Sequence, residues 1–310
     1  MKKILVTGGN GLVGNAIKKY APKDSENIFV FASREDGDLM KEADVRNLIS
    51  KHKPNYVIHT AAKVGGIGGN MAGQGDFFYQ NLLINAYMIH FCHEYNVEKL
   101  LAFSSVCVFP DKVSVLQEDL MHEGPPHRSN FAYANAKRMV DIQIQAYKSQ
   151  FNRSNYCSVM PGNIFGPNDN YSLTNGHVIP SLIHKIYKAK GENKDFKVWG
   201  DGKSLREFLL VDDLAEILIK MLKLESLPDR LIVSGFQQYS ISEVIDTLVK
   251  VSDFKGNVVY EANQPNGQRS RPSDLTLLKS LFPEFKPTDL ETGLKKSYDW
   301  FSSNFPNIRT

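Results

Sequence analysis

The chain has 310 residues, of which 42% are apolar and 23% are charged, and its formal net charge is +3. This composition is ordinary for a folded globular protein. The small net charge argues against a protein that binds nucleic acid or a membrane surface, although local Arg or Lys side chains can still bind an anionic ligand.

The first half of the chain alternates apolar strand patterns with helical patterns. Continuous apolar strands that alternate with helices indicate a parallel sheet covered on both faces. We therefore predict an α/β fold, a Rossmann-type doubly wound parallel sheet. Strands are expected at residues 3–7, 27–33, 55–60, 99–104 and 156–160, and helices at 12–20, 76–95 and 131–151.

The alternation ends near Pro161. Residues 161–176 are rich in Gly, Asn and Pro and are predicted to be irregular. They precede an expected helix at 178–190, a hairpin around 198–202, a helix at 211–224 and a strand at 230–234. We expect a smaller C-terminal α/β substrate-binding subdomain over the carboxyl edge of the sheet, where ligands bind in such folds. The predicted sheet domain comprises residues 1–160 plus about 195–225, and the predicted subdomain comprises 161–194 and 226–310.

Three glycines form a phosphate-binding pattern directly after the first strand. Gly8, Gly11 and Gly14 are spaced Gly-x-x-Gly-x-x-Gly, and the first predicted helix begins among them. This context predicts a dinucleotide whose pyrophosphate lies at the helix N-terminus, where backbone N–H groups and the helix dipole favour an anion. The same loop supplies Asn10, Leu12 and Val13 as candidate cofactor contacts.

The residues after the second strand predict which nicotinamide cofactor binds. NAD-binding proteins usually carry an acidic residue there, which bonds the ribose 2′-hydroxyl. Here Ser33 and Arg34 occupy that place. A hydroxyl and a guanidinium suit a 2′-phosphate, so we predict NADP(H). Asp44 and Val45 are the expected contacts to the adenine.

Four residues between 105 and 137 predict carbonyl chemistry. Tyr133 and Lys137 are four residues apart, so they share one face of the predicted helix. We expect the ammonium to lower the pKa of the phenol, which then gives a proton to a carbonyl under reduction. Ser105, just past a strand, adds a hydroxyl for the same oxygen. Cys107 adds a titratable base that hydride transfer alone does not require.

With these residues assembled, the chain resembles the extended short-chain dehydrogenase/reductase family and, within it, the GDP-L-fucose synthases, which are 3,5-epimerase/4-reductases of a 4-keto sugar. Several short motifs in the same order carry the resemblance over nearly the whole chain. They are the glycine loop, residues 59–62 and 64–67, 105–110, Tyr133 with Lys137, 163–170, 176–180 and 206–209. Two segments depart from the family pattern. Gly162 stands where the family usually has Thr, and residues 65–75 match poorly beyond Ile67.

The resemblance implies an NADPH-dependent enzyme that acts on a GDP-linked 4-keto sugar. Cys107 is then the base and His177 the acid for inversion at C3 and C5, while Ser105, Tyr133 and Lys137 serve reduction at C4. It implies further cofactor contacts from Ala61, Ala62, Lys137, Pro161, Asn163 and Ile164. It implies substrate contacts from Val64, Ser105, Val106, Cys107, Asn163, His177, Val178, Lys185, Trp199, Arg206 and Arg271. By the same analogy, the helix at 82–95 is expected to build a homodimer.

The three cysteines, Cys92, Cys107 and Cys157, form neither a disulfide framework nor a zinc-binding spacing. The start of the sequence lacks the apolar segment of a signal peptide, which also favours a reducing cytoplasm. Two alternatives to the main interpretation stay open. One is a C4-reductase whose GDP-4-keto hexose or heptose is epimerised by another enzyme, and the other is a non-catalytic NADP-binding sensor.

Overall fold

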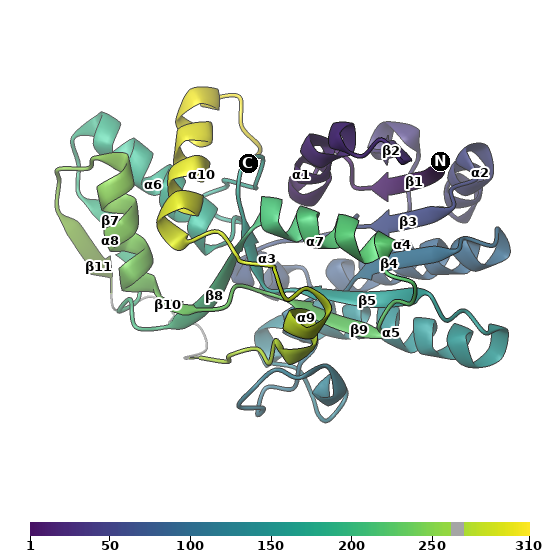
Figure 1. Ribbon diagram of the computed structural model, residues 1–310. Coiled ribbons are helices and arrows are strands. Elements are labelled where there is room, and N and C mark those ends of the chain that lie inside the picture. Colours follow the sequence, from purple (N-terminus) through teal and green to yellow (C-terminus); the bar gives the residue numbers. More distant parts are fainter. Residues whose placement is uncertain (262–269) are drawn as a thin grey trace.

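The computed structural model describes residues 1–261 and 270–310. Its largest element is a six-stranded parallel sheet in the order β2-β1-β3-β4-β5-β9 (Figure 1). The strands are β1 (Lys2–Thr7), β2 (Asn27–Ala32), β3 (Tyr56–His59), β4 (Lys99–Phe103), β5 (Tyr156–Pro161) and β9 (Arg230–Val233). From β1 the chain first adds β2 on one side and then crosses over to add β3, β4 and β5 on the other, so the strand order reverses between β1 and β3, as in a doubly wound sheet. The predicted Rossmann-type α/β fold is confirmed.

Helices cover both faces of this sheet. On one face α1 (Leu12–Tyr20) packs against α7 (Val211–Lys223), and on the other α4 (Gln74–Glu94) packs against α2 (Glu42–His52) and α5 (Phe131–Phe151). Successive strand residues point to opposite faces. Ile4 and Val6 therefore belong to the core beside α1 and α7, while Leu5 belongs to the core beside α2, α4 and α5.

The carboxyl ends of the strands meet along one edge of the sheet. Thr7 at the end of β1 pairs with Ala32 of β2 on one side and with His59 of β3 on the other. His59 in turn pairs with Ala102, next to the last residue of β4. The loops that follow these strands therefore begin close together, and they carry most of the predicted site residues.

A second lobe faces this edge (Figure 1). It contains a three-stranded sheet, β10-β8-β6, and a two-stranded sheet, β11-β7, built from β6 (Asn163–Phe165), β7 (Phe196–Trp199), β8 (Leu205–Leu210), β10 (Gln238–Ser240) and β11 (Val258–Glu261). A separate apolar core joins them to α6 (Val178–Glu192), α8 (Ile241–Ser252) and α10 (Leu290–Asn304). The described residues also form two short α-helices, α3 (Ile67–Ala72) and α9 (Thr276–Leu281).

Three expectations for the second half of the chain are corrected. The hairpin at 198–202 is wrong, because β7 pairs with β11, and β8 pairs with β6 and β10. Both strands lie in the small lobe and not in the predicted sheet domain. Conversely, β9 lies at the edge of the large sheet, although residues 226–310 were assigned to the subdomain. Segment 161–176, predicted to be irregular, contains the short strand β6.

Candidate active site

The glycine loop has the geometry that a pyrophosphate requires. Gly8 has a φ of +70°, and a Cβ on Gly14 would lie 2.4 Å from the carbonyl oxygen of Gly8. The α1 helix follows at Leu12, and its N-cap, Gly11, supplies no side-chain hydrogen bond to the first turn. The loop can therefore approach an anion closely at an uncapped helix N-terminus. Val13 is buried, so its side chain supports the loop from below, while the Asn10 side chain accepts a hydrogen bond from Lys18 (2.9 Å).

The residues after β2 form a short 3₁₀ turn, Arg34–Asp36, capped by Ser33. The Asp36 carboxylate accepts hydrogen bonds from the Ser33 amide (2.8 Å) and hydroxyl (3.3 Å). Among the described residues Arg34 forms no ion pair, and its side chain is exposed. Arg34 is therefore the available cation at this end of the strand.

Asp44 and Val45 lie near the start of α2, and their side chains differ in burial. The Asp44 carboxylate accepts a hydrogen bond from the Asp38 amide (2.9 Å). Val45 is fully buried in the core beside α2, α4 and α5. The Val45 side chain therefore points into the core, so a contact with the adenine would come from its backbone. The adenine contacts of Asp44 and Val45 stay a prediction.

The loop after β3 rests on a buried polar group. His59 Nδ1 lies 2.7 Å from Thr7 Oγ1, and Nε2 lies 3.2 Å from Asn85 Oδ1. Burial, and then the charge of Lys137, lower the pKa of His59 to about 3, so the ring stays neutral. Ala61 and Ala62 follow this histidine, half-buried at the carboxyl edge, and the Ala61 amide donates a hydrogen bond to Thr7 Oγ1 (3.4 Å).

Ser105 joins two of the predicted catalytic residues. It caps the 3₁₀ turn Val106–Val108, and its Oγ accepts a hydrogen bond from the Cys107 amide (3.2 Å). Its side chain also hydrogen-bonds to the Tyr133 hydroxyl and to the Cys107 thiol. The structure thus brings together a hydroxyl and a thiol from the segment after β4 and a phenol from α5, as the sequence predicted. Val106 packs its side chain against the core below them.

The pKa expectation for Tyr133 is wrong. Burial, with the neighbouring Cys107, raises the pKa of Tyr133, and the hydrogen bond from Ser105 only partly opposes this shift. Lys137 Nζ donates a hydrogen bond to the Phe103 carbonyl (2.8 Å), and burial lowers the pKa of Lys137 to about 7. The spacing of four residues placed both groups correctly on α5, but desolvation determines their protonation.

Burial and two neighbouring cations have opposite effects on the pKa of Cys107. Burial raises the pKa of its thiol, whereas the hydrogen bond to Ser105 and the charges of Arg271 and Arg206 lower it. Asn130 Nδ2 approaches the sulfur at 3.7 Å. Arg271 also donates a hydrogen bond to the Pro110 carbonyl (2.8 Å) and Arg206 to the Leu205 carbonyl (2.7 Å). Two predicted substrate cations therefore converge on the predicted base.

His177 is the N-cap residue of α6 in the small lobe. It keeps an exposed face, yet desolvation by the surrounding protein, and then Arg309, lower its pKa below the ordinary value for histidine. The loop after β3 meets the same segment, because the Gly66 amide donates a hydrogen bond to the Asn175 carbonyl (3.0 Å). Val64 and Val178 are both exposed there. The structure gives no direct contact between His177 and Cys107.

Lys185 and Trp199 form a second predicted substrate cluster. The Lys185 ammonium lies 4.6 Å from the centre of the Trp199 ring, which is 54% exposed. Burial lowers the pKa of Lys185, and Glu261 opposes that shift. An exposed indole beside a cation is suited to a flat base or ribose that carries phosphates.

The link from β5 to β6 explains the departure at residue 162. Pro161 is buried at the end of β5, Ile164 packs against the main core, and Asn163 Nδ2 donates a hydrogen bond to the Glu207 carbonyl (2.9 Å). A Cβ on Gly162 would lie 2.2 Å from Ser234 Oγ and 3.0 Å from Ser234 Cβ. Thr is therefore excluded here by the side chain that follows β9.

Substitution of Gly162 should be destabilising because Ser234 fills the adjacent space. We expect Gly162→Ala to lower the free energy of unfolding by about 1–3 kcal/mol, as overpacking does in other cores. Urea denaturation measures this. Gly191→Ala is the control, since a Cβ there meets nothing within 4 Å. In a double variant with Ser234→Gly, the loss should be smaller than the sum of the single losses; additive losses would contradict the packing argument.

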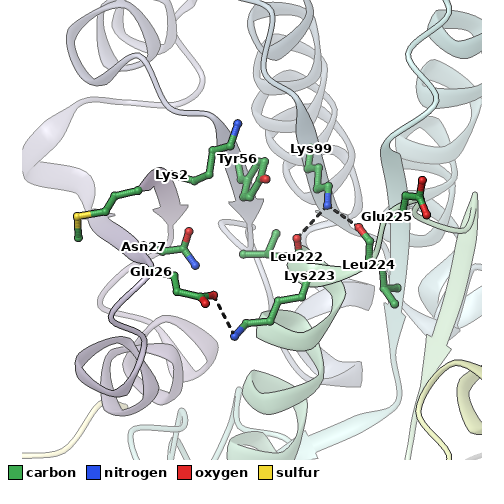
Figure 2. Close-up of a pocket in the computed structure, with 10 residues that line it drawn as sticks. Lys2, Glu26, Asn27, Tyr56, Lys99, Leu222, Lys223, Leu224 and Glu225 are labelled. Atoms are coloured by element: carbon green, nitrogen blue, oxygen red, sulfur yellow. Dashed lines mark hydrogen bonds and ion pairs between the residues drawn. The ribbon is translucent and has the colours of Figure 1, made fainter.

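A cavity outside these clusters lies at the opposite edge of the large sheet. Its volume is about 420 Å³. Figure 2 shows the residues that line it at the amino ends of the strands. Lys99 Nζ donates hydrogen bonds to the carbonyls of Leu222 (2.9 Å) and Leu224 (2.5 Å), and Lys223 pairs with Glu26 (3.5 Å). Lys99 and Lys223 thus hold the end of α7, Lys2 pairs with Glu98, and none of the predicted site residues lines the cavity.

Sequence reasoning missed two side chains beside the predicted base. Asn130 precedes α5 and approaches the Cys107 sulfur, and Arg138 of α5 binds the turn that carries Cys107. A signal for Arg138 was present, because it occupies a helix position next to Lys137 where an apolar residue would suit a buried face. Its partner, the Val108 carbonyl, is 30 residues away, and the sequence pattern does not show such contacts.

Comparison with known proteins identifies the family of this chain. The NAD dependent epimerase/dehydratase family matches residues 4–233. A GDP-L-fucose synthase of Dictyostelium discoideum is 40% identical, and the alignment covers 99% of this chain and 98% of the relative. Among solved structures, a GDP-L-fucose synthetase of Naegleria fowleri bound to NADP has a TM-score of 0.93 and 36% identity, over 100% of this chain and 95% of that one.

A GDP-6-OMe-4-keto-L-xylo-heptose reductase of Campylobacter jejuni is also similar. It has a TM-score of 0.89 and 26% identity, and 98% of each chain is covered. Identity to the GDP-L-fucose synthases is higher and extends over nearly the full length of both chains. The chain therefore belongs to the NAD dependent epimerase/dehydratase family and, within it, to the GDP-L-fucose synthases.

Proposed function

We propose that this chain catalyses the NADPH-dependent reduction at C4 of a GDP-linked 4-keto-6-deoxy sugar, after inversion at C3 and C5. The observation that carries the proposal is the contact of Ser105 with both Tyr133 and Cys107, which places a proton donor and a base beside one carbonyl position. The family membership supports the same substrate class, since the relatives of highest identity are GDP-L-fucose synthases.

The proposed inversion uses the acidity of protons next to a ketone. Cys107, as thiolate, removes the proton from C3 or C5, and the negative charge moves to the C4 oxygen, where Ser105 and Tyr133 donate hydrogen bonds. His177, as imidazolium, returns a proton to the opposite face of the ring. The thiol and the neutral imidazole then recover their starting protonation from solvent.

A bound NADPH supplies the hydride for C4. The Gly8–Gly14 loop is suited to its pyrophosphate, and Arg34 to its 2′-phosphate. Tyr133 gives its proton to the C4 oxygen as the ketone becomes an alcohol. Its raised pKa keeps the phenol protonated at neutral pH, which is the form that a proton donor requires. Lys137 lies one helical turn further along α5, where its amine can bind the nicotinamide ribose.

The test uses GDP-4-keto-6-deoxymannose as substrate. In heavy water without NADPH, the enzyme should exchange deuterium into C3 and C5. With NADPH, product NMR should show a reduced sugar inverted at both centres. Reduction without exchange would instead support the alternative, a C4-reductase only, for which the raised pKa of Cys107 and the likeness to the Campylobacter jejuni reductase are the favouring observations.

The preference for NADPH is assigned to Arg34. We expect Arg34→Ala to raise the KM for NADPH about 10-fold or more, because a charge-assisted hydrogen bond to phosphate contributes about 1.5–3 kcal/mol. The KM for NADH should stay nearly unchanged. Lys51→Ala, which removes an exposed cation from α2, is the control. Equal changes in both constants would contradict the assignment.

We also propose a homodimer that forms through α4 and α5. These helices pack together, and Phe78, Tyr79 and Ile142 on them are exposed apolar side chains. Sedimentation velocity measures the mass in solution, and a monomer at micromolar concentration would contradict the proposal. Among the described residues, no helix is long and apolar enough to cross a membrane; a cytoplasmic location is our proposal.

A further inference from the structure

Arg138 connects the helix that carries Tyr133 to the turn that carries Cys107. It follows Lys137 on α5, and its Nε donates a hydrogen bond to the Val108 carbonyl at 2.7 Å. Val108 is the last residue of the 3₁₀ turn in which Cys107 lies. The Arg138 side chain is buried in this position. The contact therefore fixes the far end of the turn to the catalytic helix.

The buried guanidinium of Arg138 lowers the stability of the folded state. Burial lowers the pKa of Arg138, and the structure gives it a carbonyl as partner instead of a carboxylate. Its Nη2 is buried and has no hydrogen-bond partner among the described residues. A buried charge without an opposite charge destabilises the folded state. An apolar side chain would fill the same space without this cost, so packing alone does not account for the arginine.

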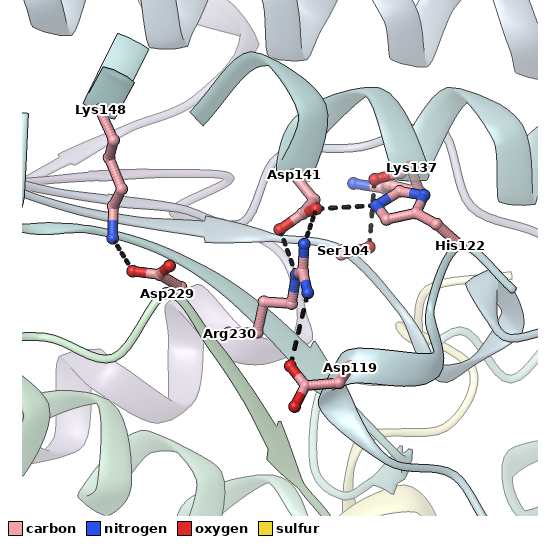
Figure 3. A network of polar contacts seen from close by, with 8 residues as sticks. All are labelled: Ser104, Asp119, His122, Lys137, Asp141, Lys148, Asp229 and Arg230. Atoms are coloured by element: carbon pink, nitrogen blue, oxygen red, sulfur yellow. Dashed lines mark hydrogen bonds and ion pairs between the residues drawn. The ribbon is translucent and has the colours of Figure 1, made fainter. Parts of the chain in front are cut away.

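The near end of the same segment is held by the preceding residue of α5. Lys137 Nζ donates a hydrogen bond to the Phe103 carbonyl (2.8 Å), and Ser104 Oγ donates one to the Lys137 carbonyl (3.1 Å) (Figure 3). Residues 103–108 are thus attached to α5 at both ends, by Lys137 and by Arg138. Cys107 lies between these two attachments, and of the two side chains Arg138 binds the end nearer to it.

The helix itself has a separate anchor. Asp141, one turn beyond Lys137, accepts two hydrogen bonds from Arg230 of β9 (2.7 and 2.8 Å), and its carboxylate lies 2.8 Å from His122 Nε2 (Figure 3). Asp141 is almost fully buried. Loss of the Arg138 side chain should therefore leave α5 and Tyr133 in place while it frees the turn with Cys107.

We propose that Arg138 is a positioning residue that sets the place of Cys107 relative to Tyr133, and so determines how the substrate divides between inversion at C3/C5 and direct reduction at C4. This inference rests on the proposed function. Inversion needs the thiol at a carbon of the sugar ring, whereas hydride transfer needs the phenol at the C4 oxygen. A displaced turn impairs the first reaction and spares the second.

The experiment measures the two reactions separately in Arg138→Met. Inversion is followed as deuterium exchange into C3 and C5 of GDP-4-keto-6-deoxymannose without NADPH. Hydride transfer is followed as oxidation of GDP-L-fucose at C4 by NADP⁺. We expect exchange to fall about 10- to 100-fold, as for other small misplacements of a reacting group. Oxidation should fall far less, and the NADPH-dependent product should contain sugar reduced without inversion.

Two further variants separate positioning from folding. In Arg138→Lys the ammonium can reach the same carbonyl, so exchange should recover most of its rate. Arg153→Met is the matched control, because Arg153 also bonds a backbone carbonyl, that of His93 (3.0 Å), away from the turn with Cys107. Its ratio of exchange to oxidation should equal that of the unaltered enzyme.

The outcomes distinguish this role from the proposed function. If Arg138→Met lowers exchange and oxidation by the same factor, or changes neither, the role of Arg138 is overturned while the function stands. The same holds if Arg138→Lys behaves like Arg138→Met. If the unaltered enzyme reduces the ketone without any exchange, the inversion half of the proposed function fails, and the role of Arg138 fails with it.

Discussion

Replacement of Tyr133 by Phe should lower the rate of C4 reduction about 10²- to 10⁴-fold, which is the usual contribution of a positioned general acid. Tyr133 is buried and its pKa is raised, so at neutral pH it holds the proton that the new alcohol requires. Phe keeps the ring and its edge contact with Phe77, so the fold should be retained. The measurement is the rate of NADPH oxidation with the GDP-4-keto sugar.

The exchange reaction shows whether the effect is chemical. In the proposed mechanism Ser105 would still donate a hydrogen bond to the C4 oxygen in Tyr133→Phe, so deuterium exchange at C3 and C5 should fall much less than reduction. Tyr156→Phe is the control, since that hydroxyl is also buried and donates to the Val97 carbonyl (3.3 Å), in the core. A Tyr133→Phe enzyme that reduces the ketone at the unaltered rate would remove this residue from the mechanism.

Replacement of Cys107 by Ala should have the opposite pattern. We expect the exchange rate to fall about 10²- to 10⁴-fold, because the general base is lost. Reduction at C4 should persist and yield a sugar whose C3 and C5 are not inverted. Product NMR with NADPH shows the stereochemistry directly. Cys157→Ala, in the buried strand β5, is the control and should leave the inverted product unchanged.

The pH dependence of deuterium exchange is a second test of Cys107 as the base. The reactive form is the thiolate, and burial raises the pKa of this thiol above its ordinary value. The thiolate fraction of Cys107 should therefore still be rising with pH in the neutral range. His177 must be protonated to act as the acid, and its pKa is lowered, so the imidazolium fraction falls over the same range. The exchange rate should therefore be small and nearly flat between the two pKa values, and it should fall at pH below the pKa of His177, where the thiolate is lost without any gain in imidazolium. An exchange rate that does not fall on this acidic side would contradict the assignment of Cys107 as base.

Local patterns predicted the parts of the site that are contiguous in sequence. The spacing of Gly8, Gly11 and Gly14 predicted the cofactor loop, because a tight turn and close backbone approach favour glycine. Helical spacing predicted that Tyr133 and Lys137 share one face of α5. The convergence of Arg206 and Arg271 on Cys107 depends on how two lobes meet, which spacing does not encode. The predicted direction of the pKa shift of Tyr133 was wrong for a related reason. Desolvation depends on everything packed around a group, and for Tyr133 it is the largest cause of the shift.

The large sheet shows the same limit. Gly200 and Gly202 correctly indicated a turn, since both have positive φ, but a turn does not determine which strands pair. The strand β9 was predicted at nearly its observed bounds, yet its partner β5 lies about 70 residues earlier along the chain. Pairing at that separation is decided by the apolar faces of the whole sheet. Helix α2 was missed because only three of its residues, Val45, Leu48 and Ile49, are buried and apolar.

The position of β9 means that neither lobe is an autonomous folding unit. A truncated chain that stops after β5 would lack β9 and α7, and so would expose the apolar face that Leu214, Leu218 and Ile232 now bury. Such a fragment should aggregate instead of binding dinucleotide, and the intact chain should melt in a single cooperative transition. A chimera that takes its small lobe from a relative should therefore keep α7 and β9 from the protein that supplies the large sheet.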